Sequence, residues 1–360
     1  MSRRAAPDGF LFAGTLMLLV FGLVMLYSAS AFVAEAGSRS PFHFLTRQAV
    51  WAIAGMGLMI AAARLDYRVL ARPAVAWGLF AVIAALLVAT LGTAPINGSS
   101  RWIRLFGFTL QPSEPAKLAV IILVAHLVAR NPPDTWRRLL APLGCIAVIC
   151  GLIFLQPDLG TATFLGITGV MIVYLGGARI LHLGALAGVA VPLMAAGILS
   201  AEYRVRRVTS FLDPFADPLD HGFQLVQSLI ALGRGGLTGV GFSNGEQKLL
   251  YLPEPHADFV FSVIGEELGL IGGAAVIAVF FLYGLRALVV SAKAPDLFGK
   301  LVGCGAALAI TLQAFINISV ATGLMPTTGL PLPFVSAGGS ALLTSMIAAG
   351  LILSVSQRVP

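Results

Sequence analysis

Long segments without charged side chains alternate with short charged segments along almost the whole chain. Seven of them lack Asp, Glu, Lys and Arg over 16 to 28 residues, and they cover residues 9–34, 48–63, 73–100, 139–157, 159–178, 180–201 and 268–285. Residues 301–357 form one further uncharged segment. The sequence GLMPTTGLPLPF at 323–334 divides it into two predicted helices, because Gly and Pro interrupt helices. This pattern predicts nine apolar helices.

A shorter apolar segment at residues 118–129 raises the predicted number to ten. It has 12 residues, whereas a membrane-spanning helix needs about 20. The segment can span a membrane only if its helix also includes Glu114 and Lys117, which lie just before it. These two ionisable residues are therefore the first candidates for a functional role.

Composition identifies the class of protein. Hydrophobic residues make up 58% of the 360 residues, charged residues 11%, and the mean hydropathy is +0.92. Soluble domains carry about 25% charged residues, so this chain cannot cover its surface with solvated groups. We therefore predict an all-α polytopic membrane protein with about ten transmembrane helices, organised as a single domain over residues 1–360. The first uncharged segment, at 26 residues, exceeds the roughly 7–15 residues of a signal-peptide core and is predicted to be a membrane span.

The distribution of Lys and Arg predicts the orientation. With the N-terminus inside, 13 of the 23 positive residues lie at inner helix ends, 5 in short outer segments and 5 in a long outer loop at about 200–257. Cytoplasmic loops are enriched in Lys and Arg, so both termini are predicted to be cytoplasmic and the large loop extracytoplasmic. Orientation thus explains the net charge of +7. No basic segment is interleaved with aromatic residues, and no nucleic-acid partner is expected.

The large loop offers little chemistry of its own. Apolar residues at helical spacing, as in GFQLVQSLIAL at 222–232, predict amphipathic helices in the membrane interface. The glycine-rich segment GRGGLTGVGFSNG at 233–245 lacks the GxxxxGK[ST] of a nucleotide-binding loop and is predicted to be a flexible hinge. The cysteines have no metal-ligand spacing and are predicted to be packing residues; they are Cys145, Cys150 and Cys304.

Three predicted helices begin on the outer side, each after a sequence that combines proline with an acid. These sequences are QPSEPAK (111–117), QPDLG (156–160) and YLPEPHAD (251–258). A single acid in such a place is more often an N-cap, or a charge that complements the helix dipole, than a functional group.

Two features favour a functional site for the set. Glu114 and Lys117 are three residues apart and share a helix face near the membrane region, where ionisable residues are usually functional. If the eighth helix begins near His256, then Asp258, Ser262 and Glu266 also share a face. This polar stripe predicts an acid-lined pocket that opens to the outer leaflet. The other histidines are isolated and are predicted to be structural.

Several long motifs occur in order along the chain. They are GLVMLYSAS (22–30), NGSSRWIRL (97–105), QPSEPAKLA (111–119), LQPDLGTA (155–162), FLDPFADPLDHGFQLVQSLIALGRGGLTGVG (211–241), QKLLYLPEPHADFVFSVIGEELG (247–269) and GLPLPFVSAGGSAL (329–342). In these motifs the whole chain resembles the shape, elongation, division and sporulation (SEDS) family of membrane-embedded peptidoglycan glycosyltransferases. It resembles the division members more than the elongation members. Ala337 and Ala257 depart from the family pattern, which usually has tyrosine and threonine there.

The resemblance implies that the protein polymerises lipid II, a disaccharide-pentapeptide on a polyprenyl pyrophosphate. The reaction would take place at the outer leaflet of the bacterial plasma membrane, in septal cell-wall synthesis. Asp258 matches the family's essential aspartate and is predicted to be the general base that takes the proton of the acceptor 4-hydroxyl. The predicted substrate-binding residues are Glu114, Lys117, Arg101, Gln111, Asp158, Glu254, His256, Glu266 and Ser336.

The leaving pyrophosphate needs positive charge near it. Lys117, Arg101 or a divalent cation such as Mg²⁺ or Mn²⁺ could supply that charge, and the sequence leaves these alternatives and the metal ligands open. No organic cofactor is expected.

The resemblance also implies partners. These are a class B penicillin-binding protein that acts as the transpeptidase, other divisome proteins and the lipid bilayer. Three alternative functions stay open: a lipid II flippase, an elongation-type polymerase and a structural scaffold. The depth of the charged site in the membrane distinguishes a flippase from a polymerase. A transporter tends to place its charged site near the midplane, whereas these acids lie at the outer starts of helices.

Overall fold

A computed structural model describes residues 5–93, 101–105, 108–218, 222–248 and 256–359. Ten long helices within these residues correspond to the ten predicted apolar segments. They are α1 (Gly9–Ala36), α2 (His43–Arg64), α3 (Pro73–Leu91), α4 (Ser113–Arg130), α5 (Trp136–Leu155), α6 (Leu159–Leu175), α7 (Ile180–Leu199), α10 (Val260–Ala292), α11 (Leu297–Ala321) and α12 (Gly339–Ser356). The all-α polytopic architecture is confirmed. Eight of these helices are long and apolar enough to cross a membrane on their own composition; α6 is shorter, with 17 residues, and α4 contains the ion-pairing residues.

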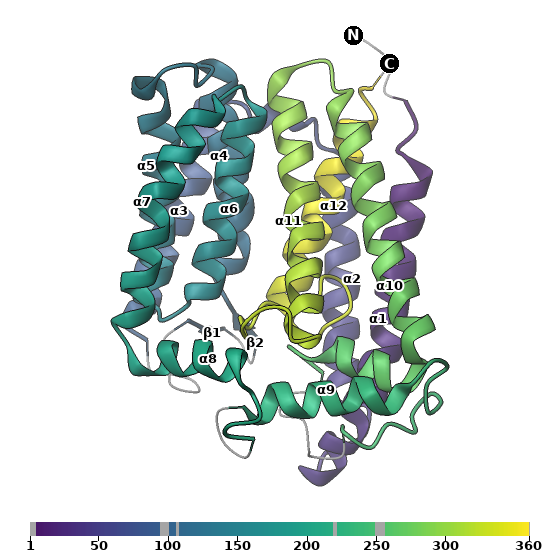
Figure 1. The fold of residues 1–360 in the computed structure, drawn as a ribbon. Helices are drawn as coiled ribbons and strands as arrows, with labels where there is room; N and C mark the ends of the chain where they lie inside the picture. The colour runs from purple at the N-terminus through teal and green to yellow at the C-terminus, as the bar shows by residue number, and fades with distance from the viewer. Residues whose placement is uncertain (1–4, 94–100, 106–107, 219–221, 249–255, 360) are drawn as a thin grey trace.

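Shorter elements join the long helices. They are the 3₁₀ turn η1 (Tyr67–Val69), the strands β1 (Ile103–Leu105) and β2 (Phe108–Leu110), and the helices α8 (Glu202–Leu212) and α9 (Phe223–Gly235). The two strands form an antiparallel hairpin in which Ile103 lies opposite Leu110. The helices α8 and α9 lie within the predicted large loop and run across one end of the bundle (Figure 1).

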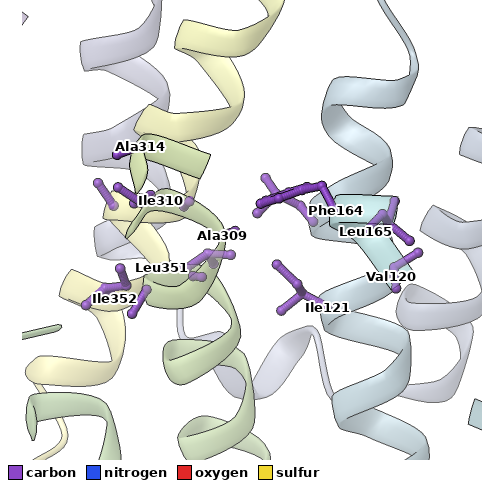
Figure 2. Close-up of a cluster of buried hydrophobic side chains, with 14 of the residues drawn as sticks. Val120, Ile121, Phe164, Leu165, Ala309, Ile310, Ala314, Leu351 and Ile352 are labelled. Carbon is purple, nitrogen blue, oxygen red and sulfur yellow. The ribbon is translucent and has the colours of Figure 1, made fainter. Parts of the chain in front are cut away.

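The long helices stand side by side in two groups, with α3 to α7 in one and α1, α2, α10, α11 and α12 in the other (Figure 1). The groups meet where α4 and α6 pack against α11 and α12. Figure 2 shows this contact, in which Ile121 and Phe164 face Ala309 and Ile310. Because α4 lies at the centre, 14 of its 18 residues are buried, including Glu114 and Lys117. Protein rather than lipid therefore surrounds the ion pair.

Both ends of the described chain lie at the same end of the bundle, opposite α8, α9 and the hairpin (Figure 1). Asp8 pairs with Arg286 at 2.7 Å, and the N–H of Ala5 donates to the carbonyl oxygen of Gln357 at 3.0 Å. The two ends of the chain are thus held together. The predicted cytoplasmic location of this end stays a prediction.

The helix α10 is broken at Gly269, which has φ 67° and ψ −169°. The segment 236–241 crosses the break. The N–H groups of Val240 and Gly241 donate to the carbonyl oxygens of Glu266 and Glu267, and Leu270 and Ile271 donate to the carbonyls of Gly236 and Leu237. These four bonds satisfy the backbone groups that the break releases, as a membrane-embedded helix requires. The prediction that this glycine-rich segment is a flexible hinge is therefore wrong: it is paired with α10.

Candidate functional site

A cavity of about 640 Å³ lies at the end of the bundle opposite the termini. Its walls come from the start of α2, the hairpin region, α8, residues 256–258 and the segment 328–341. Four predicted site residues line it, and they are Arg101, Gln111, His256 and Asp258. Glu254 lies outside the described residues. The other five predicted residues are buried and do not line this cavity.

The backbone of Asp258 and of the two residues before it is held by three successive hydrogen bonds. The carbonyl of His256 accepts from the N–H of Ala337 at 2.8 Å, and that of Ala257 accepts from the hydroxyl of Ser336 at 2.6 Å. The carbonyl of Asp258 itself accepts from the side-chain amide of Asn317 at 2.9 Å. Loops are normally mobile, but here three consecutive peptide groups are fixed, so the carboxylate that lines the cavity has a rigid support.

Ser336 is one of these supports and was predicted to bind substrate. Its hydroxyl donates to the carbonyl of Ala257 and accepts from the N–H of Leu332 at 2.9 Å. The hydroxyl hydrogen is therefore already used within the protein. This geometry makes Ser336 a residue that positions the segment before Asp258.

The predicted polar stripe on α10 is wrong. The helix begins at Val260, so Asp258 precedes it and helical spacing does not apply to this residue. Ser262 instead contacts the hydroxyl of Ser228 at 2.5 Å. The carboxylate of Glu266 accepts from the backbone N–H of Glu246 at 2.9 Å. Of the three residues in the stripe, Asp258 lines the cavity, and the other two fix α9 and the following loop against α10.

Glu114 and Lys117 form a buried ion pair behind the cavity. The two side chains are 4% and 3% exposed, and the Lys117 ammonium donates to Glu114 Oε1 at 2.8 Å. It also donates to Gln313 Oε1 at 2.7 Å, while Gln313 Nε2 donates to the carbonyl of Pro331 at 2.8 Å. Pro331 lines the cavity. The ion pair therefore reaches the cavity wall through Gln313.

Arg101 and Asp158 join the hairpin region to the end of α5. The guanidinium of Arg101 donates to the carbonyl oxygens of Gln156, at 2.9 Å, and Pro157, and lies 3.5 Å from the Asp158 carboxylate. Asp158 also caps α6, because its carboxylate accepts from the N–H of Thr161 at 3.0 Å. It is 3% exposed. The ordinary structural reading of this acid, as an N-cap, therefore fits the geometry.

His256 lies beside Asp258 and packs on Phe44, with 4.5 Å between the ring centroids. Burial lowers the pKa of His256 to about 4, so the ring is neutral at pH 7. Ala257 and Ala337, which depart from the family pattern, both line the cavity next to this histidine. The described residues contain no group of three or more His, Cys, Asp or Glu side chains that could hold a metal ion.

Sequence reasoning missed several residues of the site. Arg47 and Arg207 line the cavity, and the sequence indicated them only as part of the overall distribution of Lys and Arg. Gln313 and Asn317 are amides four residues apart in the uncharged segment 301–357, and this spacing was an available signal. Gln48 also belongs to the site, although no sequence pattern indicated it. Its side-chain amide donates to the carbonyl of Ser336 at 3.2 Å and accepts from the N–H of Gly338 at 3.3 Å.

Known proteins resemble this chain over nearly its whole length. Residues 10–359 match the family of cell cycle proteins that comprises FtsW, RodA and SpoVE. A probable peptidoglycan glycosyltransferase FtsW of Geobacter sulfurreducens is 39% identical over 348 residues, which cover 95% of this chain and 93% of the relative. The stage V sporulation protein E of Bacillus subtilis is 39% identical over 360 residues, covering 99% and 98%.

Solved structures agree with these sequence matches. A chain from a peptidoglycan synthase complex that coordinates polymerization and crosslinking superposes with a TM-score of 0.80 at 31% identity, covering 98% of each chain. The rod shape determining protein RodA of Thermus thermophilus gives a TM-score of 0.73 at 28% identity, again over 98% of each chain. The protein belongs to the FtsW, RodA and SpoVE family.

Proposed function

We propose that this protein is a peptidoglycan glycosyltransferase that polymerises lipid II for septal cell-wall synthesis. The names of its relatives support the reaction class, and the relatives named FtsW support the division-type role over the elongation-type one. The observation that carries the proposal is Asp258, a carboxylate that lines a cavity while its own backbone and that of the two preceding residues are held in place.

The proposed reaction uses Asp258 as the general base. Its carboxylate accepts the proton of the acceptor 4-hydroxyl while that oxygen forms a bond to the anomeric carbon of the donor strand. The bond between this carbon and the diphosphate oxygen breaks, and its electron pair leaves with the polyprenyl diphosphate. A positioned base typically accelerates such a step about 10²–10⁴-fold.

A divalent cation stays a prediction. The described cavity residues bring one carboxylate, that of Asp258, and the described residues contain no cluster able to hold a metal without further ligands. They do not form a protein-only metal site, and no step of the proposed reaction is assigned to a metal.

The proposed orientation places the termini in the cytoplasm and the cavity at the outer leaflet of the bacterial plasma membrane. The excess of Lys and Arg at the inner helix ends supports this. The cavity lies at the end of the bundle opposite the termini. A lipid-linked sugar on the outer face could therefore reach Asp258 without crossing the membrane.

A lipid II flippase is the second candidate function. The ion pair of Glu114 and Lys117 is buried among helices, as in many transporters. However, Lys117 and Glu114 do not line the described cavity, which lies at one end of the bundle. This arrangement favours the polymerase.

The proposed partners are a class B penicillin-binding protein and other divisome proteins, at the division septum. The structural relative from a complex that couples polymerization to crosslinking supports the first of these. A polymerase of this kind requires a separate transpeptidase to crosslink its product.

The experiment that tests the function uses purified protein with fluorescently labelled lipid II, with and without its transpeptidase partner. In detergent, where sidedness disappears, we expect glycan strands on a gel. Protein reconstituted in sealed vesicles is assayed in parallel for movement of lipid II between leaflets. Transport in vesicles without any polymer in detergent would exclude the glycosyltransferase and establish the flippase.

A further inference from the structure

The proposed reaction must neutralise a departing diphosphate, and the two cations that the sequence suggested for this are already engaged. Lys117 is 3% exposed and donates to both Glu114 and Gln313. The guanidinium of Arg101 donates to two backbone carbonyls and lies beside Asp158. Lys117 cannot turn toward the cavity without breaking these contacts, and Arg101, which lines the cavity, already uses its guanidinium within the protein.

Two other arginines line the cavity with exposed side chains. Arg47 lies in the second turn of α2, and Arg207 lies on α8. Within the described part of the chain neither forms an ion pair, and Arg207 makes a contact with the ring of Tyr203 at 5.9 Å from its centroid. The cavity thus carries two cations whose charge no described carboxylate balances at contact distance.

The other two arginines on α8 do not line the cavity and bind other groups of the protein. Arg206 pairs with Glu202 and does not line the cavity. Arg204 is 8% exposed, donates to the carbonyl of Gly197 at 2.7 Å and stacks on Phe154. Of the three arginines on this helix, Arg207 is the one that faces the same cavity as Asp258.

We infer that Arg47 and Arg207 together bind the diphosphate of a polyprenyl-diphosphate-linked substrate. This inference rests on the proposed function. Guanidinium groups bind phosphate oxygens through two parallel hydrogen bonds, which makes arginine well suited to this ligand. As the bond between the anomeric carbon and the diphosphate oxygen breaks, negative charge grows on the diphosphate, and cations already in place stabilise that charge.

The position of the two residues at the end of the bundle fits a lipid-linked ligand. The helix α8 is amphipathic and lies across the end of the bundle (Figure 1), where an interfacial helix meets lipid headgroups. A diphosphate that joins a sugar to a polyprenyl chain belongs at the same depth. Arg47 and Arg207 would therefore hold the diphosphate while Asp258 faces the sugar.

The test compares Arg47→Ala and Arg207→Ala with the matched controls Arg39→Ala and Arg206→Ala. Each control removes the same charge from an exposed site outside the cavity: Arg206 adjoins Arg207 in sequence, and Arg39 precedes α2. We expect kcat/KM for lipid II to fall about tenfold to a hundredfold in the two cavity variants, as for loss of a hydrogen bond to a charged group. The controls should stay within about twofold of the wild type. Arg207→Lys should recover only part of the activity, because an ammonium cannot bind two phosphate oxygens in parallel.

A binding measurement separates this inference from the proposed function. Farnesyl diphosphate, a short polyprenyl diphosphate, is titrated calorimetrically into wild type and the same variants. We expect its Kd to rise about tenfold or more in Arg47→Ala and Arg207→Ala, and Asp258→Ala to bind at least as tightly as wild type. Unchanged binding and unchanged kcat/KM in both cavity variants would overturn the inference while leaving the polymerase intact. Absence of polymer with wild type would instead refute the proposed function, and the titration would still test the anion site.

Discussion

At the scale of single residues, the site depends on side chains that donate hydrogen bonds to the backbone at Asp258. Asn317 is 1% exposed, and its amide donates both to the carbonyl of Asp258 and to that of Leu330 at 2.8 Å. It lies on α11, 59 residues further along the chain. One side chain therefore joins the segment that carries the carboxylate to the loop before α12.

Replacing Asn317 by Leu keeps the number of side-chain heavy atoms and their branching but removes both hydrogen bonds. We expect kcat to fall at least tenfold with little change in KM, because small displacements of a reacting group can reduce rates about 100-fold. The control is Thr311→Val, which removes a buried hydroxyl that bonds only within α11. Steady-state polymerisation kinetics would distinguish the two variants. A fall in Asn317→Leu no larger than in Thr311→Val would remove Asn317 from its positioning role.

The pH response of His256 follows from its burial. Its pKa of about 4 in the folded protein lies below the ordinary value near 6.5. The unfolded chain therefore binds a proton that the folded protein excludes as pH falls through 6.5 toward 4, and stability is lost over that range. Above 6.5 the residue has no effect. We expect the thermal midpoint in detergent to fall more for wild type than for His256→Gln between pH 7 and pH 4.5. Parallel curves would contradict this pKa.

At the scale of elements, the break in α10 provides the backbone groups that hold the loop before Asp258 against this helix. Residues 236–241 pair with the helix on both sides of Gly269. Lys248 then bonds Glu267 at 2.5 Å and Ser28 at 2.8 Å, so the same loop is also tied to α1. Glu266, which was predicted to bind substrate, and its neighbour Glu267 thus anchor the loop.

Gly239 tests this pairing. It has φ +82°, and a Cβ there would overlap the carbonyl oxygen of Glu267. We expect Gly239→Ala to destabilise the protein by about 1–3 kcal/mol. The matched control is Gly233→Ala, on α9, where a Cβ meets no atom within 4 Å and helix propensity favours Ala. Thermal unfolding in detergent measures both, and equal midpoints for the two variants would contradict the pairing.

The sequence predicted the helices better than it predicted the site. Uncharged segments identified all ten long helices, including α4, whose apolar segment was too short to span a membrane unless Glu114 and Lys117 also belong to the helix. The hydropathy pattern did not predict the break at Gly269, because this residue lies inside an uncharged apolar segment. The contact between Asn317 and Asp258, and the presence of Arg47 and Arg207 in one cavity, depend on how distant helices pack. Local periodicity carries no information about such contacts.

At the scale of the whole molecule, the chain termini and the cavity lie at opposite ends of the helix bundle. The termini and the pair of Asp8 with Arg286 lie at one end, and the cavity lies at the other (Figure 1). If the positive-inside rule sets the orientation, the cavity opens on the outer face. The orientation therefore decides whether the site can meet a lipid-linked sugar on that face.

Cysteine labelling tests the orientation. In a chain whose native cysteines, Cys145, Cys150 and Cys304, are replaced by Ala, single cysteines are placed at the exposed positions Asp213 and Asp134. We expect a membrane-impermeant thiol reagent to label position 213 in intact cells and position 134 only after permeabilisation. Labelling of 134 in intact cells would reverse the orientation.

The central claim is that Asp258 is the general base of a polymerase. The most direct measurement is the rate of glycan synthesis from labelled lipid II by purified Asp258→Asn, compared with wild type at matched thermal stability. The amide fills the same space but cannot take the proton, so we expect the rate to fall about 10²–10⁴-fold while farnesyl diphosphate still binds. Full-length glycan made by Asp258→Asn at the wild-type rate would contradict the claim.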